Sequence, residues 1–532
     1  MKIEPGLERL FWHIPFGADL DYALFWRSQH TLPDRFRFPT LVQNVEKCTT
    51  IARQAAKTSP PGKQVFIFGA LHYWIEHTSI MGLALAGQGH HVTLGFLPYA
   101  DWFTPVSAFT MRRRILFTQD TLRPARDLMN IVLLDNGRAG KALPDKLQQD
   151  IEHISLLDCQ YTMQTETIDQ NAQLYQLRLR RNQAAARAAM LYFQKSRPDV
   201  IIIPSGSILE FGALYSVASF LGISAVTYEF SEKSDSLWLA QNAQIMRHEI
   251  DTLWETRRDI PLTKEQRERL HTYLAARQTS NQSSSLAQVL QEAPTMGKRI
   301  HAALGLDTRP TILLTTNVLG DALTLDRQLF SESMAEWFLG TLRYFLSHRD
   351  VQVIIRIHPG EKMVKGPSIS RFVEQEFPQL PEHIHLIRAD EKFNTYDLMD
   401  ISDLGLVYTT TAGLEMSTRG IPVIPGGKTH YRGRGFTIDV DTWEEYYAAL
   451  DHVLPDLPAH RLTPKQVELA WNYAYRFFLE FPRPYPWHLY SMKEDVDRHS
   501  MKDILSEEGL RSYKKTFDQL AGEPINWMDI DN

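Results

Sequence analysis

Three consecutive threonines, Thr409 to Thr411, follow a short apolar run and precede a helix-like stretch in the C-terminal half of the chain. A helix N-terminus offers free backbone N–H groups and a partial positive charge, and both suit a phosphate oxygen. The three hydroxyls add donors of the kind that a diphosphate or a phosphodiester needs. The alternative is that one threonine caps the helix while the others complete the strand. Taken alone, the pattern favours neither interpretation.

Neighbouring strand ends carry further side chains of suitable chemistry. His358 stands before a proline at the end of an apolar run, with Arg356 two residues earlier on the same strand face. An imidazole can donate a hydrogen bond to phosphate and, when protonated, offset the charge of a leaving group. Glu415 lies one turn into the helix after the threonines, where phosphate would repel it, so we expect it to contact ribose hydroxyls; the alternative is an interaction with the helix dipole. We expect Arg356, His358 and Lys428 to converge on one face.

The elements that must position these residues form a strand–helix series that opens near residue 308. Strands are predicted at 311–316, 351–359, 383–387, 403–411 and 421–427, and helices at 330–346 and 412–420. Gly420 suits the left-handed position that ends a helix. Ligands of open parallel sheets bind beyond the carboxyl ends of the strands, so the residues that follow each run are the candidates.

An earlier series has the same order of strand, helix and strand over residues 65–98 and again over 198–230. The loops after its strands offer three carboxylates, Glu76, Glu210 and Glu229. A transferase needs a carboxylate or a histidine to deprotonate the acceptor hydroxyl, whereas a double-displacement enzyme needs a carboxylate nucleophile. All three stay catalytic candidates. Glu76 ranks slightly ahead because His72 and Trp74 lie in the same loop.

Two such series predict an α/β protein with two Rossmann-like domains facing across a cleft. The polar piece TSNQSSS at 279–285 is the best linker candidate. We expect an N-terminal, acceptor-side domain with helical insertions over 1–290 and a C-terminal, nucleotide-sugar-binding domain over 300–480. We expect residues 481–532 to pack back on the first domain.

Composition and charge exclude several classes of protein. The net charge of −6 argues against a general nucleic-acid binder, which would carry a basic field. Cys48 and Cys159 match no metal-ligand spacing, and no Asp-X-Asp or His-rich cluster predicts a metal site. The N-terminal residues carry charges throughout and lack the apolar stretch of a signal peptide. The longest apolar runs are far shorter than a membrane span.

These features predict a cytoplasmic protein. Basic clusters at 112–114 and 178–181 leave peripheral contact with the inner face of the membrane open. Solvated helix faces are the simpler account of both clusters.

The segments RIHPGE, LLTTNVLGDA and ISDLGLVYTTTAGLEMSTRG resemble the C-terminal half of bacterial capsular and surface-polysaccharide biosynthesis transferases, which have the GT-B fold. The His-Pro motif with a Ser/Thr pair is similar to that of bacterial sialyltransferases and Kdo transferases, where it holds the nucleotide phosphate. The resemblance implies that His358 and Thr409 to Thr411 bind donor phosphate and that Glu415 binds the nucleotide sugar. It also implies that Asn317 and Lys428 line the same cleft. It extends over about residues 310–440 and is only architectural over 60–230.

The expected function is that of a metal-independent glycosyltransferase. It would move a sugar from a nucleotide-activated donor, its substrate, to a glycan, a lipid-linked glycan or another hydroxyl acceptor, with no further cofactor. Two alternatives on the same fold are a sugar-nucleotide 2-epimerase and a polyol-phosphate transferase. A third is a non-catalytic, degenerate transferase that acts as a scaffold. An epimerase would convert the sugar nucleotide without any acceptor.

Overall fold

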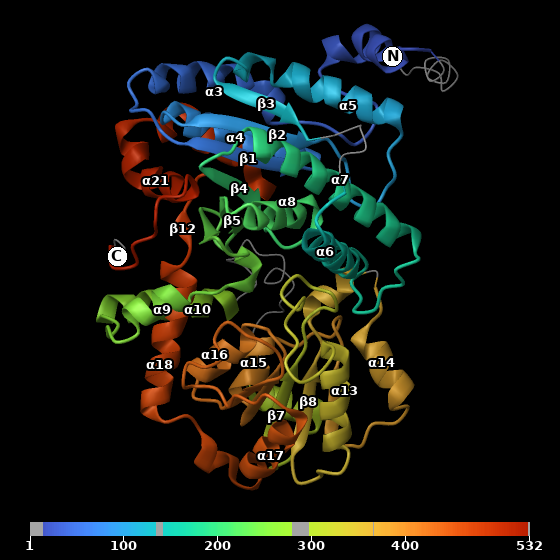
Figure 1. The fold of residues 1–532 in the computed structure, drawn as a ribbon. Coiled ribbons are helices and arrows are strands. Elements are labelled where there is room, and N and C mark those ends of the chain that lie inside the picture. Colours follow the sequence, from blue (N-terminus) through green and yellow to red (C-terminus); the bar gives the residue numbers. More distant parts are fainter. Residues whose placement is uncertain (1–13, 135–141, 279–296, 365, 530–532) are drawn as a thin grey trace. The chain divides into compact units, whose positions relative to one another are not determined.

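The computed structural model describes residues 14–134, 142–278, 297–364 and 366–529, and it divides them between two compact units. The first unit holds the residues up to Asp158, Asp169–Met246 and Arg483–Ile525. The second holds Cys159–Ile168, Arg247–Pro482 and the residues from Asn526. Each unit is built around one largely parallel sheet with helices on its faces (Figure 1). The prediction of two Rossmann-like α/β domains is confirmed.

The sheet of the first unit has the strand order β12-β6-β5-β4-β1-β2-β3. Its strands are β1 (Gln64–Ala70), β2 (His91–Leu97), β3 (Met129–Leu133), β4 (Val200–Pro204), β5 (Ser224–Phe230), β6 (Ser236–Gln241) and β12 (Arg483–Pro484). Strands β1 to β5 are parallel, whereas β6 pairs antiparallel with both β5 and β12. The central strands are continuous apolar runs because both of their faces are covered.

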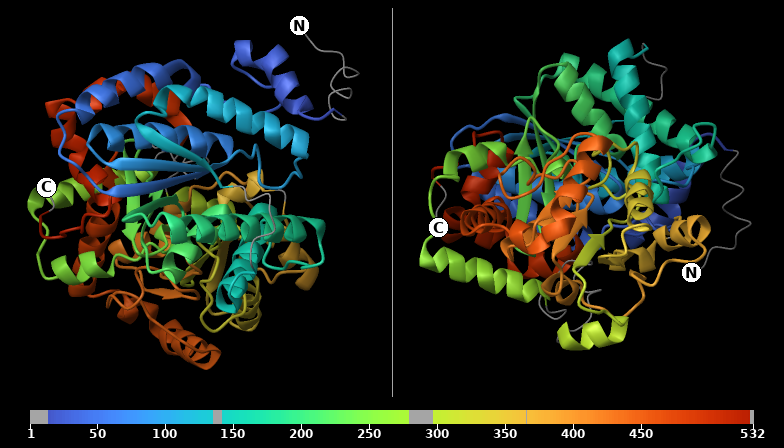
Figure 2. Two further views of the ribbon diagram at one scale, coloured as in Figure 1. Left: turned by 45° about the horizontal axis from the view of Figure 1, so that its top comes forward. Right: turned by 90° about the horizontal axis from the view of Figure 1, so that it is seen from below.

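Helices cover both faces of this sheet (Figures 1 and 2), and the contacts of alternate β1 side chains identify the helices on each face. Phe66 packs edge-to-face on Phe193 of α7 (Gln173–Lys195), and Phe68 packs on Phe211 of α8 (Leu209–Phe220). Ile67 points to the other face, toward Gly82 of α4 (His72–Gly87). The remaining helices of this unit are α2 (Gly17–Asp21), α3 (Leu41–Ala56), α5 (Ala108–Thr121), α19 (Met492–Arg498), α20 (Met501–Ile504) and α21 (Glu507–Leu520), together with most of α6 (Asp145–Met163).

The sheet of the second unit has the order β11-β10-β7-β8-β9, and its strands are all parallel. The strands are β7 (Thr311–Thr315), β8 (Gln352–Arg356), β9 (Ile384–Ile387), β10 (Leu404–Val407) and β11 (Val423–Pro425). The helices are α9 (Asp251–Arg257), α10 (Lys264–Gln278), α12 (Gly297–Leu304), α13 (Met334–Phe345), α14 (Ile369–Glu376), α15 (Thr395–Asp400), α16 (Ala412–Thr418), α17 (Trp443–Val453) and α18 (Pro464–Tyr475). Leu314 faces the core of α13 and α17, and Leu313 faces the core of α15 and α16.

Both sheets reverse their strand order once. In the first unit the chain builds outward from β1 to β3 and then returns to place β4 on the other side of β1. In the second unit β10 returns to the other side of β7 in the same way. Such a reversal leaves a crevice at the carboxyl ends of the two central strands, where doubly wound proteins bind their ligands.

The predicted strands are all present, with ends that differ by a few residues. Gly420 does end its helix in the left-handed conformation, with φ of 76°. Strands β3, β6 and β12 were not predicted from the sequence, because each is short or carries polar residues. Within the described part of the chain, no helix is both long and apolar enough to cross a bilayer.

The units divide at Met246, ahead of the boundary expected near 290. Helices α9 and α10 belong to the second unit: Trp254 packs against Tyr473 of α18 with ring centroids 5.2 Å apart, and Asn472 donates to the carbonyl of Arg258 at 2.9 Å. The linker candidate at 279–285 lies outside the described residues. Residues 483–525 complete the first sheet through β12, which pairs with β6.

A buried histidine links this returning segment to the rest of the first unit. His77 of α4 is fully buried; its Nδ1 lies 3.1 Å from the hydroxyl of Tyr228, and its Nε2 lies 3.2 Å from the carbonyl of Trp487. A carbonyl can only accept, so Nε2 carries the proton and Nδ1 accepts from the tyrosine. Burial lowers the pKa of His77 to about 3. The imidazole is therefore neutral in the folded protein.

We predict that His77 makes the first unit sensitive to acid. The unfolded chain, with a pKa near 6.5, takes up the proton before the folded chain does, so stability falls as the pH drops below that value. At about pH 5.5 the loss from this group is about 1.4 kcal/mol. His77→Gln keeps a donor and an acceptor but does not titrate. Urea denaturation measures the free energy of unfolding of both proteins. The advantage of wild type over His77→Gln should be smaller at about pH 5.5 than at about pH 7.5. An equal difference at both values would contradict the prediction.

Candidate functional site

The reversal point of the second sheet is bridged by one side chain. Oδ1 of Asn317, just beyond β7, accepts hydrogen bonds from the backbone N–H and the hydroxyl of Thr409, just beyond β10, both at 3.2 Å. Both residues are buried. Asn317 and Thr409 therefore fix the distance between the two central strands where they end. Their role at this edge is structural. The hydroxyl of Thr409 can still accept a hydrogen bond.

The next two threonines are more accessible. The Thr410 hydroxyl accepts from the backbone N–H of Ala412 at 3.3 Å, and the Thr410 carbonyl accepts from the hydroxyl of Tyr431 at 2.7 Å. Thr411 precedes α16 and makes no capping bond with its side chain. Its hydroxyl has no hydrogen-bond partner among the residues that the structure describes. The capping role thus falls to Thr410, and Thr411 presents an uncommitted hydroxyl.

His358 is held as a neutral hydrogen-bond donor. Its Nδ1 accepts from the backbone N–H of Gly360 at 3.0 Å, and its own backbone N–H donates to the hydroxyl of Thr316 at 3.1 Å. With Nδ1 acting as acceptor, the proton of the neutral ring is on Nε2. Burial, with the charge of Arg356 as a smaller cause, lowers the pKa of His358 to about 4. At neutral pH the imidazole offers an N–H group and no charge.

Arg356 is near enough to His358 to lower the pKa of that ring, but its guanidinium is engaged with backbone carbonyls. Its guanidinium is 2% exposed and donates to the carbonyls of Arg388 at 2.7 Å and Phe393 at 3.1 Å. Strand β8 ends at Arg356 and a 3-10 turn starts at Pro359, so the alternation of the strand does not continue to the histidine. Arg356 supports the loop after β9.

Glu415 differs from its expected role, whereas Lys428 stays at the edge with an exposed side chain. The Glu415 carboxylate is 2% exposed and forms an ion pair with Arg277 of α10 at 2.9 Å. It therefore holds α10 against α16, and it does not present free oxygens to a ribose. The side chain of Lys428 is exposed, whereas its backbone N–H donates to the carbonyl of Arg327 at 2.8 Å.

Sequence reasoning missed a group of cationic and imidazole side chains beside this edge, which we call the basic cluster: Arg247, His248, Arg327, His430 and Arg434. Arg327 donates to the carbonyl of Lys428 at 3.3 Å, and the rings of His248 and His430 lie 5.9 Å apart. His430 stacks on Phe477 with centroids 3.9 Å apart. The signal in the sequence is the basic segment HYRGR shortly after β11, with Arg-His at 247–248.

The arginines of the basic cluster disfavour further positive charge on its other members, and Glu249, Asp326 and Asp251 offset part of their own charge. Burial and then the charge of Arg247 lower the pKa of Arg327 to about 10. Burial, followed by His248 and Arg327, lowers the pKa of His430 well below its ordinary value. Burial and Arg327 together lower the pKa of His248 to about 3. An anion next to these groups would offset more of this charge.

In the first unit, Glu76 is a structural residue and not a free base. Its Oε1 accepts from the backbone N–H groups of Thr40 at 2.7 Å and Leu41 at 2.6 Å, at the start of α3. Those groups have no partner within the helix, and the carboxylate supplies it. Burial raises the pKa of Glu76 to about 7. Its first place among the three candidates is therefore not supported by the geometry.

Glu210 and Glu229 differ in their access to solvent and in their partners. Glu210 is 1% exposed and pairs with Arg178 at 3.1 Å. Glu229 is half-buried near the carboxyl end of β5, and its Oε1 accepts from the backbone N–H of Phe230 at 3.0 Å. Burial raises the pKa of Glu229 to about 7. Among the described residues it has no cationic partner, so of the three carboxylates it best fits a general base.

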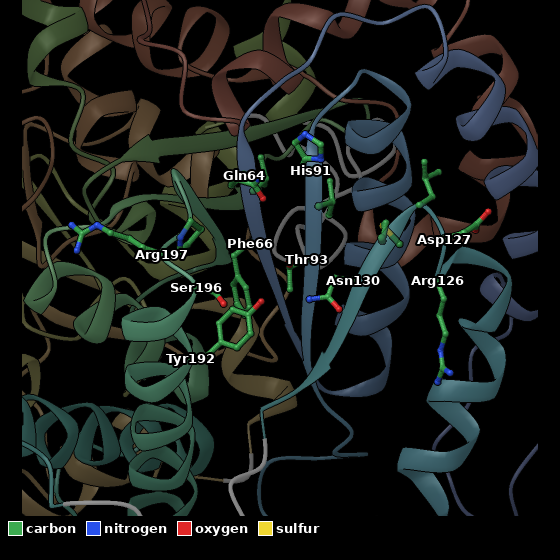
Figure 3. A pocket seen from close by; sticks show the side chains of 15 residues that line it. Gln64, Phe66, His91, Thr93, Arg126, Asp127, Asn130, Tyr192, Ser196 and Arg197 are labelled. Carbon is green, nitrogen blue, oxygen red and sulfur yellow. The ribbon is translucent and has the colours of Figure 1, made fainter.

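A hollow of about 510 Å³ lies at the amino ends of the strands of the first sheet (Figure 3). It is lined by the amino ends of β1, β2 and β3 and by the end of α7, with Gln64, His91, Asn130 and Tyr192 among its residues. Parallel strands place this hollow at the far end from Glu229. It is therefore separate from the candidate site.

Residues 262–453 match the family model described as capsule polysaccharide biosynthesis protein. This range includes Asn317, His358, the three threonines and Lys428. The resemblance of the C-terminal half to capsule biosynthesis proteins is thus confirmed. No curated protein sequence is significantly similar to the chain.

Solved structures give matches of low identity. The beta Kdo 2,4 transferase of KpsC from Thermosulfurimonas dismutans is 16% identical, with a TM-score of 0.35, over 57% of this chain and 87% of that one. The beta Kdo 2,7 transferase of the same protein is 14% identical, with a TM-score of 0.31, over 56% and 82%. UDP-GlcNAc 2-epimerase from Neisseria meningitidis, bound to UDP-GlcNAc, is 10% identical, with a TM-score of 0.26, over 78% and 98%.

We predict that Asn317→Leu destabilises the second unit. The change leaves the buried N–H of Thr409 without an acceptor, which costs about 1–3 kcal/mol. Thr411→Val is the matched control: its hydroxyl has no partner to lose, and the free energy of unfolding should change by no more than about 0.5 kcal/mol. Urea denaturation measures both variants. Equal stability of the two would show that the bridge between β7 and β10 is not needed.

Proposed function

We propose that the chain is a glycosyltransferase of capsule-polysaccharide synthesis. It transfers a sugar from a nucleotide-activated donor to a hydroxyl group of a glycan acceptor. The observation that carries the proposal is the basic cluster at the carboxyl edge of the second sheet, where Arg327 bonds to Lys428, and where Tyr431, next to His430, donates to the carbonyl of Thr410. At this edge Arg327 lies near Arg247, with Glu249 and Asp326 offsetting part of the charge, and an anionic ligand would add to that compensation. The family match over residues 262–453 supports the same class of protein.

The phosphate of the sugar nucleotide binds to two kinds of group at this edge, cationic side chains and neutral hydrogen-bond donors. Arg327 and Lys428 supply positive charge, and their backbones are joined to one another. Nε2–H of His358 and the hydroxyl of Thr411 supply neutral hydrogen bonds. Transfer of the sugar leaves negative charge on the phosphate, and pre-placed donors stabilise that charge without reorganisation. Binding of the phosphate also raises the pKa values of His248 and His430 toward their ordinary range.

Glu229 accepts the proton of the acceptor hydroxyl. A general base is most effective when its pKa lies near the working pH, and burial has brought the pKa of Glu229 to about 7. Glu76 and Glu210 are each committed to internal partners. The first unit thus supplies the base and the acceptor side, and the second unit binds the donor.

Donor binding should depend on the basic cluster and on the threonine hydroxyls. Each hydrogen bond to a charged group contributes about 1.5–3 kcal/mol when desolvated. We therefore expect Thr410→Ala with Thr411→Ala to lower donor affinity by about tenfold or more, and Arg327→Met to lower it at least as much. Isothermal titration calorimetry with CMP, UDP, GDP, CDP and dTDP measures the loss of affinity and identifies the nucleobase that the protein prefers.

Arg343→Met is the control for loss of a cation in the same unit, because Arg343 is paired with Glu376 at the exposed surface. It should leave nucleotide affinity unchanged. Unchanged affinity in the threonine variant and in Arg327→Met would contradict the donor site. Conversion of the sugar nucleotide without acceptor would contradict transfer and would favour the 2-epimerase.

Turnover should depend on the deprotonated form of Glu229. For wild type, kcat/KM should fall about tenfold per pH unit below about pH 7, because the carboxylate is then protonated. Glu229→Gln should lose most of its turnover and the pH dependence, while nucleotide affinity stays. Glu76 and Glu229 have similar pKa values, and Glu76→Gln distinguishes their roles. This variant should keep the pH dependence of kcat/KM and lose stability. Full activity of Glu229→Gln would exclude it as the base.

A further inference from the structure

The loop that follows β4 has an unusual backbone. Ser205, Gly206 and Leu209 all have positive φ, at 55°, 76° and 58°. Side chains other than glycine disfavour this region, so two such residues within five positions are costly unless the surroundings impose them. The loop lies at the reversal point of the first sheet. On the other side of that point β1 is followed by Leu71, with φ of 69° and ψ of 144°.

A buried ionic group imposes this conformation. Oδ1 of Asp158 accepts the backbone N–H of Leu209, and Oδ2 accepts from Asn182 at 2.6 Å and from Arg178 at 3.2 Å. Arg178 also pairs with Glu210, the residue after Leu209, at 3.1 Å. All four side chains are at most 1% exposed.

The effect of this group is mainly one of position. A buried ion pair adds little stability compared with an apolar replacement, because removing the charges from water is costly. It does attach the first two residues of α8, Leu209 and Glu210, to α6 and α7. The loop is also tightly packed: a Cβ on Gly206 would lie 2.5 Å from Cγ2 of Thr227. The backbone of residues 205–209 is therefore held in one conformation.

The loop presents two uncommitted hydroxyls beside the proposed base. The side chains of Ser205 and Ser207 have no hydrogen-bond partner among the described residues; Ser207 is half-buried, and Ser205 keeps 8% of its surface exposed. The backbone N–H of Ser205 donates to the carbonyl of Tyr228 at 2.8 Å, which places the loop next to Glu229. A serine hydroxyl both donates and accepts, as does a sugar hydroxyl.

We propose that residues 205–208 bind the saccharide acceptor through the hydroxyls of Ser205 and Ser207. Asp158 is the positioning residue that keeps the loop in its left-handed conformation. The proposal rests on the proposed glycosyl transfer and specifies its acceptor side. Glu210, selected from the sequence as a catalytic candidate, acts in the same ionic group and does not touch substrate.

The test uses the full chain, its preferred sugar nucleotide and, as acceptor, oligosaccharides released by mild acid from the surface polysaccharide of the source organism. Ser205→Ala with Ser207→Ala should raise the KM for the oligosaccharide by about tenfold, leaving kcat and nucleotide affinity within about twofold. Asp158→Ala should raise the same KM, because it releases the loop while both serine hydroxyls stay in place. Asp158→Asn, which keeps an acceptor for Leu209, should recover part of the loss. Asp150→Ala on the same helix is the control.

Each outcome decides between the two proposals. An unchanged oligosaccharide KM in the double serine variant, with normal wild-type turnover, overturns the acceptor loop and leaves the transferase in place. Wild type that releases no nucleotide in response to the oligosaccharide overturns both. If Asp158→Ala fails to fold, the serine variants still decide, because they remove only hydroxyls that have no hydrogen-bond partner among the described residues. Equal loss of donor and acceptor binding in those variants would mean general disruption and would also overturn the proposal.

Discussion

Reversal of strand order at the centre of a parallel sheet sends the two following connections to opposite faces, and it leaves a gap between them beyond the strand ends. Both units of this chain are built on that arrangement, at β1 and β4 and at β7 and β10. In the second unit Asn317 bridges the gap. In the first unit the loop after β4 is held from the side by Asp158. The residues left accessible at these edges are those to which we assign chemistry.

Burial sorts the polar residues of the two edges into two groups. Side chains with complementary partners, such as Glu415 with Arg277 and Glu210 with Arg178, bind helices and loops together. Side chains without such partners keep their chemistry available, with shifted pKa values, as Glu229 does. The same low polarity that raises the pKa of a carboxyl group lowers that of an imidazole. A neutral histidine donor and a carboxylate titrating near neutrality therefore arise from one physical cause.

The fold was largely predictable because buried parallel strands are short apolar runs with clear ends. The candidate edge of the second sheet could be located too, since His358 and the threonines directly follow such runs. Partners could not be predicted, because Arg277 and Glu415 are 138 positions apart and their ion pair depends on tertiary packing. The same holds for the basic cluster, whose members come from separate loops.

The return of β12 to the first sheet makes the order of synthesis matter. As the chain leaves the ribosome, β6 is made with one edge unpaired, and its partner follows only after the whole of residues 247–482. The carbonyl of Trp487, which His77 requires inside the unit, arrives equally late. An exposed strand edge invites pairing with other chains. The first unit is thus begun first but lacks residues 483–525 until the whole of residues 247–482 has been made, and during this interval its unpaired strand edge favours aggregation.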